Sequence, residues 1–184
     1  MKISKKIPLR CAAILAVATL FSSLSAAQTD SAIDSAVLTK RADASGLSHS
    51  DRSFIEKAAK AGTKEVEISQ AVEGRVTDPE VKAMAQMMIA DHMAANTELA
   101  ALAARKGVTL PMDNMKASEK WSKKTKELDE DYVKEMKEDH EDAVKLFEKG
   151  AKSDDPEIAA FASKTLPTLQ HHLSMVKELK KTVN

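Results

Sequence analysis

The sequence has few aromatic residues and few glycines, and both shortages exclude classes of protein. Aromatic residues make up only 3% of the chain, and no segment alternates Val, Ile, Thr and aromatic residues with a period of two. A β-sandwich or barrel is therefore not expected, and frequent Ala and Met favour helices. The five glycines form no phosphate-binding loop and no Gly-x-Ser-x-Gly motif, so we expect no nucleophilic catalytic residues.

The first 27 residues have the three parts of a secretory signal peptide. Four basic residues open it: Lys2, Lys5, Lys6 and Arg10. An apolar run over residues 11–24 follows, and small residues occupy 25–27. This order predicts a signal peptide of residues 1–27, cleaved after Ala27. The run is shorter than the about 20 apolar residues that cross a bilayer, so the mature chain should have no transmembrane segment.

Cleavage would also remove the one cysteine and change the charge. Cys11 leaves with the signal peptide, so the mature chain could form no disulfide and would depend on packing. The whole chain has 28 basic and 28 acidic residues, and four basic residues leave with the signal peptide. A mildly acidic mature chain is not expected to bind nucleic acid. We expect a periplasmic or secreted protein; no lipid-attachment pattern supports association with the outer membrane.

The remaining chain divides into a flexible linker, 28–50, and a four-helix bundle, 51–182. The periodicity of apolar residues predicts helices over 51–73 and 78–106, a third that begins between 118 and 128 and ends near 150, and a fourth from 155 onward. Asp-Pro pairs open the second and fourth helices. Ser53 and Glu56 have capping-box spacing in the first. Short turns predict two antiparallel hairpins, joined by a longer connection over 107–117. This connection lets the third helix run parallel or antiparallel to the second, and ferritin-like bundles use a long crossover there.

Each predicted helix carries one titratable residue on its apolar face. These residues are Glu65, His92, His140 and His172. Polar groups inside an apolar core are costly unless they are paired or bind a metal. Four helices that turn these faces inward could bring one carboxylate and three imidazoles together, which is a ligand set suited to one zinc, copper, iron or nickel ion.

Two interpretations of these four residues remain open. They could hold one transition-metal ion, or they could form a metal-free network of buried hydrogen bonds. A di-iron centre is not expected, because it requires Glu-x-x-His pairs, and Ile89, Lys137 and Leu169 stand three residues before the three histidines. Asp91 and Asp139 precede two of the histidines. Each could pair with a residue of another helix or face solvent, and we favour solvent.

Several segments resemble the family named domain of unknown function 4142. In the first half they are Asp78-Pro79-Glu80-Val81-Lys82 and Met88-Ile89-Ala90-Asp91-His92. In the second half they are Tyr132-x-x-x-Met136-x-x-x-His140 and Leu166-Pro167-x-Leu169-x-x-His172. The resemblance covers about residues 51–180. It implies a ferritin-like fold and export; members are often labelled predicted outer-membrane proteins, and no activity follows from the resemblance.

The hypothesis from the sequence is an exported, periplasmic ferritin-like bundle that could hold a single metal ion between Glu65, His92, His140 and His172. The alternative is a metal-free structural or interaction module of the cell envelope or stress response. A metal-dependent oxidoreductase ranks third, because no residue pattern indicates a catalytic site. The substrate, the protein partners and the oligomeric state do not follow from the sequence.

Overall fold

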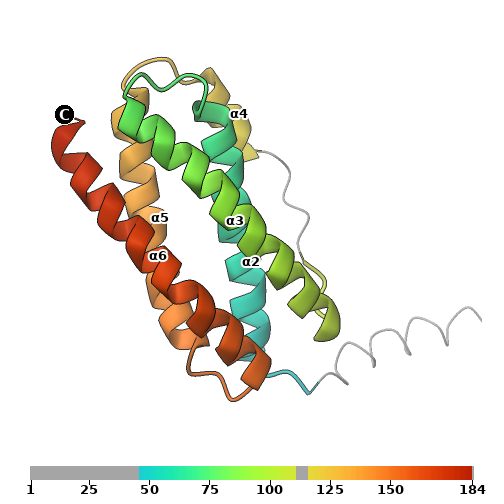
Figure 1. Cartoon of the computed structure of the whole chain (residues 1–184). Helices are drawn as coiled ribbons and strands as arrows, with labels where there is room; N and C mark the ends of the chain where they lie inside the picture. Colours follow the sequence, from blue (N-terminus) through green and yellow to red (C-terminus); the bar gives the residue numbers. More distant parts are fainter. Residues whose placement is uncertain (1–45, 111–115, 184) are drawn as a thin grey trace, which may run out of the picture.

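The structure is a computed structural model that describes residues 46–110 and 116–183. All secondary-structure elements in this part of the chain are helices. The elements are α2 (His49–Val72), α3 (Pro79–Arg105), α4 (Lys116–Lys123), α5 (Leu128–Gly150) and α6 (Pro156–Thr182) (Figure 1). The four long helices form the predicted bundle, and α4 is an additional short helix. The predicted signal peptide and most of the linker 28–50 lie outside the described residues.

The bundle consists of two antiparallel hairpins, α2–α3 and α5–α6, packed side by side. Ion pairs fix their relative direction. Lys64 in the middle of α2 contacts Asp139 in the middle of α5, whereas Arg105 at the end of α3 contacts Glu157 at the start of α6. α3 therefore ends at one end of the bundle, and α5 begins at the other (Figure 1). The sequence left this direction open; in the structure α3 and α5 are parallel, as the long connection allows.

The helix starts agree only partly with the sequence signals. Asp78 and Asp155 cap α3 and α6, each accepting two backbone N–H groups in the first turn. The predicted capping box at Ser53 is wrong, because α2 begins earlier, at His49. Its cap is Ser48, whose hydroxyl accepts the N–H of Asp51 at 3.1 Å.

The third predicted helix is divided into two. Its highly charged early part forms α4, which ends at Lys123, and α5 begins after Glu127, a residue with a left-handed backbone (φ 51°). Trp121 of α4 is buried against Tyr132, with ring centroids 6.3 Å apart. Asp129, in the first turn of α5, accepts the N–H of Asp78 at 2.8 Å. This end of the bundle is therefore closed by α4 and by the α2–α3 turn.

The core has two apolar clusters with a polar layer between them. One cluster contains three phenylalanines at the end where α2 begins: Phe54, Phe147 and Phe161. The other contains residues such as Ile68, Met88, Met136 and Val176 toward the opposite end. The four titratable residues of the helix faces lie in sequence between the two clusters on every long helix. None of the helices over the described ranges is long and apolar enough to span a membrane.

Candidate metal centre

The structure brings the four predicted residues together in the middle of the bundle. Glu65 comes from α2, His92 from α3, His140 from α5 and His172 from α6. All four are buried, with at most 5% of any residue exposed. The three imidazole ring centroids lie 5.3–5.5 Å from one another. One carboxylate and three imidazoles thus share a single level of the core, away from bulk solvent.

Glu65 and His92 form a buried pair. His92 Nδ1 lies 2.9 Å from Glu65 Oε2. Burial alone would raise the pKa of Glu65, but the charge and hydrogen bond of His92 outweigh it and lower that pKa. Burial would likewise lower the pKa of His92, but the Glu65 carboxylate raises it. Because an ionised carboxylate only accepts hydrogen bonds, Nδ1 of His92 is the protonated nitrogen and donates to Glu65.

His140 is held by the backbone of its own helix. Its Nδ1 lies 2.9 Å from the carbonyl oxygen of Met136, one turn earlier in α5. A carbonyl oxygen only accepts, so Nδ1 of His140 carries a proton and donates it. Burial lowers the pKa of His140, and the attraction of Glu65 offsets this only in part. The ring is therefore neutral near pH 7, and its Nε2 has a free lone pair.

His172 is oriented by Asp91, a residue that we expected to face solvent. His172 Nε2 lies 3.0 Å from Asp91 Oδ2, between α6 and α3. Burial lowers the pKa of His172 to about 4, against the opposing hydrogen bond to Asp91. Asp139 also pairs with another helix, through Lys64 at 2.7 Å, so the pairing alternative holds for both aspartates, although Asp91 stays 44% exposed. Each aspartate points about 100° away from the histidine that follows it, and so reaches a neighbouring helix instead.

The ring nitrogens that do not donate a hydrogen bond are the ones able to bind a metal. His92 Nε2, His140 Nε2 and His172 Nδ1 carry no proton when the three rings are neutral and donate through the other nitrogen. One nitrogen from each ring can be chosen so that all three lie within 4.8 Å of one another. His140 Nε2 and His172 Nδ1 are 3.3 Å apart, about the separation of two nitrogens bound at ~2.05 Å to one tetrahedral ion.

The role of Glu65 in the cluster differs from that of the three histidines. Among the described residues, the group with convergent ligand atoms is His92, His140 and His172, without Glu65. Glu65 Oε2 holds the outer nitrogen of His92, as carboxylates commonly do for metal-bound histidines. Its other oxygen, Oε1, is buried without a hydrogen-bond partner in the described structure, and so is His92 Nε2. The sequence identified Glu65 but could not distinguish a ligand from a residue that positions one.

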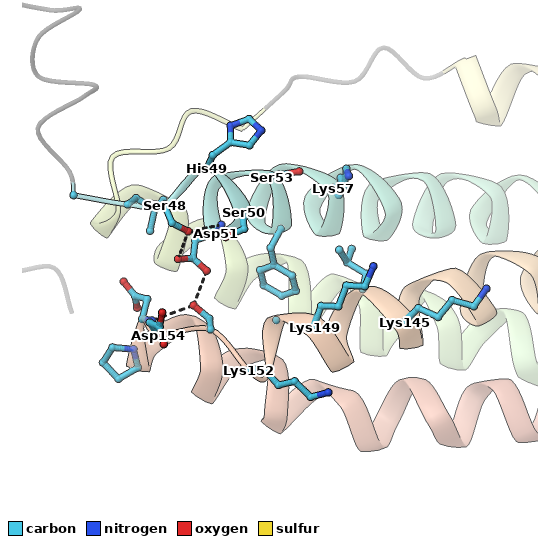
Figure 2. Close-up of a pocket in the computed structure, with 18 of the residues that line it drawn as sticks. Ser48, His49, Ser50, Asp51, Ser53, Lys57, Lys145, Lys149, Lys152 and Asp154 are labelled. Carbon is cyan, nitrogen blue, oxygen red and sulfur yellow. Dashed lines mark hydrogen bonds between the residues drawn. The ribbon is translucent and has the colours of Figure 1, made fainter.

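An open depression of about 990 Å³ lies at the end of the bundle where α2 begins. Figure 2 shows that lysines from α2, α5 and the following turn surround it. Its hydrogen bonds are structural: Ser153 donates to Asp51 at 2.5 Å and accepts the N–H of Asp155 at 3.0 Å. These bonds tie the α5–α6 turn to the start of α2, and Glu65 and the three buried histidines do not line this space.

Comparison with known proteins places the chain in a family. Residues 36–179 match the model of a family described as domain of unknown function (DUF4142), and the chain belongs to this family. No curated protein matches the chain. The fold is similar to that of a crystal structure of a DUF305 fragment from Deinococcus radiodurans, with a TM-score of 0.64 and 10% sequence identity. The match covers 73% of this chain and 97% of the fragment, and at this identity it shows the fold alone.

Proposed function

We propose that this protein binds one first-row transition-metal ion through His92, His140 and His172. One observation carries the proposal: each imidazole has a hydrogen-bond acceptor at one nitrogen, and one nitrogen of each ring can be chosen so that all three lie within 4.8 Å of one another. Carboxylate or carbonyl acceptors behind histidine ligands fix the tautomer and the ring orientation of a metal site. Glu65, the Met136 carbonyl and Asp91 supply these acceptors here.

The hydrogen-bond pattern favours a metal over a metal-free network. His140 Nε2 and His172 Nδ1 face each other at 3.3 Å, and both are unprotonated when the two rings are neutral. Two lone pairs at this distance repel unless a cation lies between them. His92 Nε2 is also buried without a partner, which costs free energy in an apolar core. A single metal ion would satisfy all three nitrogens at once.

The ligand set suggests which ions to test. Three imidazole nitrogens suit zinc, copper, iron and nickel, whereas magnesium and calcium prefer oxygen ligands. We take zinc as the first probe because it has no redox chemistry and binds histidine at about 2.0–2.1 Å. Binding should release a proton from His92, whose pKa the Glu65 carboxylate raises, but not from His140 and His172, whose lowered pKa values leave them neutral near pH 7.

The test is a zinc titration of the untagged protein, followed by calorimetry and thermal unfolding. We expect one zinc ion per chain. At a free zinc concentration 100 times the Kd, binding should stabilise the fold by about 2.7 kcal/mol, which corresponds to a rise in Tm of roughly 6–12 °C. His172→Gln should weaken zinc binding by at least about 100-fold, since it removes a direct ligand.

The neighbouring histidine provides a matched control. His171 is exposed, so His171→Gln should leave zinc affinity within about twofold of the parent. If zinc neither binds stoichiometrically nor raises Tm, the four residues form the metal-free layer of the alternative hypothesis. In that case His172→Gln should change only stability.

We also propose that the metal site acts outside the cytoplasm, after removal of residues 1–27. The basic, apolar and small-residue regions of that segment support export. N-terminal sequencing of the protein recovered from a periplasmic extract should begin at Gln28. If the protein recovered from the periplasm begins at Met1, the predicted signal peptide is not cleaved.

A further inference from the structure

A small cavity adjoins the histidine cluster. Its volume is about 20 Å³, and both Glu65 and His92 line it. Residues one turn from the other two histidines, Ala143 and Leu169, line it as well. A cavity of this size holds one water molecule, since the minimum is about 10–15 Å³. The cavity therefore lies beside the metal-binding level, toward the cluster that contains the phenylalanines.

Two polar atoms of the cavity residues have no hydrogen-bond partner in the described structure. They are Glu65 Oε1 and His92 Nε2, and their side chains are only 2% and 6% exposed. Buried polar atoms are nearly always hydrogen-bonded or bound to an ion. His92 Nε2 is accounted for by the proposed metal, but Glu65 Oε1 is not, because three histidines provide the ligands. His140 Nδ1 lies 3.5 Å from this oxygen, but it donates its proton to the Met136 carbonyl at 2.9 Å. Glu65 Oε1 therefore still needs a hydrogen-bond donor.

Given the proposed metal site, we infer that the bound ion keeps a fourth, exchangeable coordination position in this cavity, occupied by one water molecule that donates a hydrogen bond to Glu65 Oε1. Three protein ligands plus one water is the arrangement of open metal sites, whereas structural zinc sites have four protein ligands. The cavity limits the exchangeable ligand to the size of water. Glu65 also determines which kind of ligand can occupy this position, since a carboxylate favours a hydrogen-bond donor and repels an anion.

Cu²⁺-loaded protein gives a direct test of this water. After equilibration in ¹⁷O-enriched water, pulsed electron–nuclear double resonance detects oxygen bound to the copper ion. We expect one strongly coupled ¹⁷O in the parent protein. Ala95→Val adds bulk at a residue that lines the cavity, so this variant should retain copper and lose the ¹⁷O coupling. Ala94→Val is the matched control, because Ala94 is exposed on the same helix; it should retain both.

Fluoride tests the role of Glu65, because it is an anion of about the size of water. The parent protein should keep its water in the presence of fluoride, since the carboxylate repels the anion. Glu65→Gln replaces the charge with an amide that can donate, so fluoride should bind to the copper at a concentration at least tenfold lower. The ¹⁹F coupling in the copper spectrum measures this binding.

The outcomes separate this inference from the proposed function. Copper bound by the histidines without any ¹⁷O coupling overturns the open position and leaves the metal site intact. Equal fluoride affinity in the parent and in Glu65→Gln overturns the contact between Glu65 and the exchangeable ligand. A protein that binds neither copper nor zinc overturns the proposed function itself.

Discussion

At the scale of single residues, the orientation of each imidazole is set by the group behind it. Glu65, the Met136 carbonyl and Asp91 each accept a hydrogen bond from one ring. The three acceptors belong to different helices or to the backbone, so they fix the rings independently. Asp91 differs from the other acceptors, because its side chain is 44% exposed and its removal should leave the apolar core intact.

We therefore predict that Asp91→Ala separates metal affinity from folding. Loss of the hydrogen bond to His172 Nε2 frees the ring to rotate and removes its preferred tautomer, so zinc affinity should fall by about 10–100-fold. The free energy of unfolding of the metal-free protein should change by only about 1 kcal/mol. Competition with a chelator measures the first quantity, and urea denaturation measures the second.

Asp142→Ala is the matched control for this variant. Asp142 lies on α5, its side chain is 83% exposed, and it pairs with Lys145. Zinc affinity should not change in this variant. An unchanged affinity in Asp91→Ala as well would show that Asp91 does not position a metal ligand.

The sequence predicted which side chains meet but not how they are paired. Glu65, His92, His140 and His172 follow from helical periodicity, because a residue on the apolar face of a helix must point into the core. The role of Asp91 did not follow. In the sequence, a residue beside the apolar face is equally compatible with facing solvent and with contacting a neighbouring helix. The rotation of α3 relative to α6 determines which of the two Asp91 does.

At the scale of the helices, close packing depends on Gly150, the last residue of α5. A Cβ atom at this position would lie 2.4 Å from the Phe54 ring, which is buried against Phe147 at a centroid distance of 5.2 Å. The ring has little room to move, so we predict that Gly150→Ala lowers the free energy of unfolding by about 1–3 kcal/mol. Chemical denaturation measures this loss.

Gly74 gives the comparison for that substitution. No atom lies within 4 Å of a Cβ built there, so Gly74→Ala should be neutral or should stabilise the fold by up to about 1 kcal/mol. Equal effects of the two substitutions would mean that the contact between Gly150 and Phe54 is not tight.

The cap of α6 should make stability depend on pH. Burial alone would raise the pKa of Asp155, but the Lys106 ammonium and the backbone N–H groups of Glu157 and Ile158 outweigh it and lower that pKa. The ionised carboxylate thus stabilises the fold fully above the unfolded-state pKa of about 3.9, and this contribution is lost as the pH falls through the lowered folded-state pKa.

We predict that Asp155→Ala costs about 1 kcal/mol at pH 7, whereas Asp155→Asn, which still caps the helix, costs less. The difference in stability between the parent and Asp155→Asn should be constant above about pH 5 and should shrink below about pH 4. Urea denaturation across this range measures it. A difference that grows on acidification would contradict the lowered pKa.

The helix boundaries illustrate what local signals can specify. Asp-Pro pairs located the starts of α3 and α6, because a capping carboxylate and a proline both act within one turn. The break between α4 and α5 was not visible in the charged stretch that contains it. It depends on tertiary contacts, such as the burial of Trp121 against Tyr132 and the hydrogen bond from Arg75 to the Trp121 carbonyl at 2.7 Å.

At the scale of the whole molecule, two apolar clusters enclose a polar layer. Four long helices each contribute one group to this layer, so its geometry depends on the register of all of them. The parallel course of α3 and α5 determines which histidines face one another. The sequence could not specify that direction, because a long connection is compatible with either one.

The most direct measurement is a zinc-edge anomalous difference map from a crystal of the untagged, zinc-loaded protein. We predict one strong peak in the middle of the bundle, about 2.0–2.1 Å from a nitrogen of each of His92, His140 and His172. No peak in that layer, or peaks only at exposed residues such as His171, would contradict a metal centre in this fold.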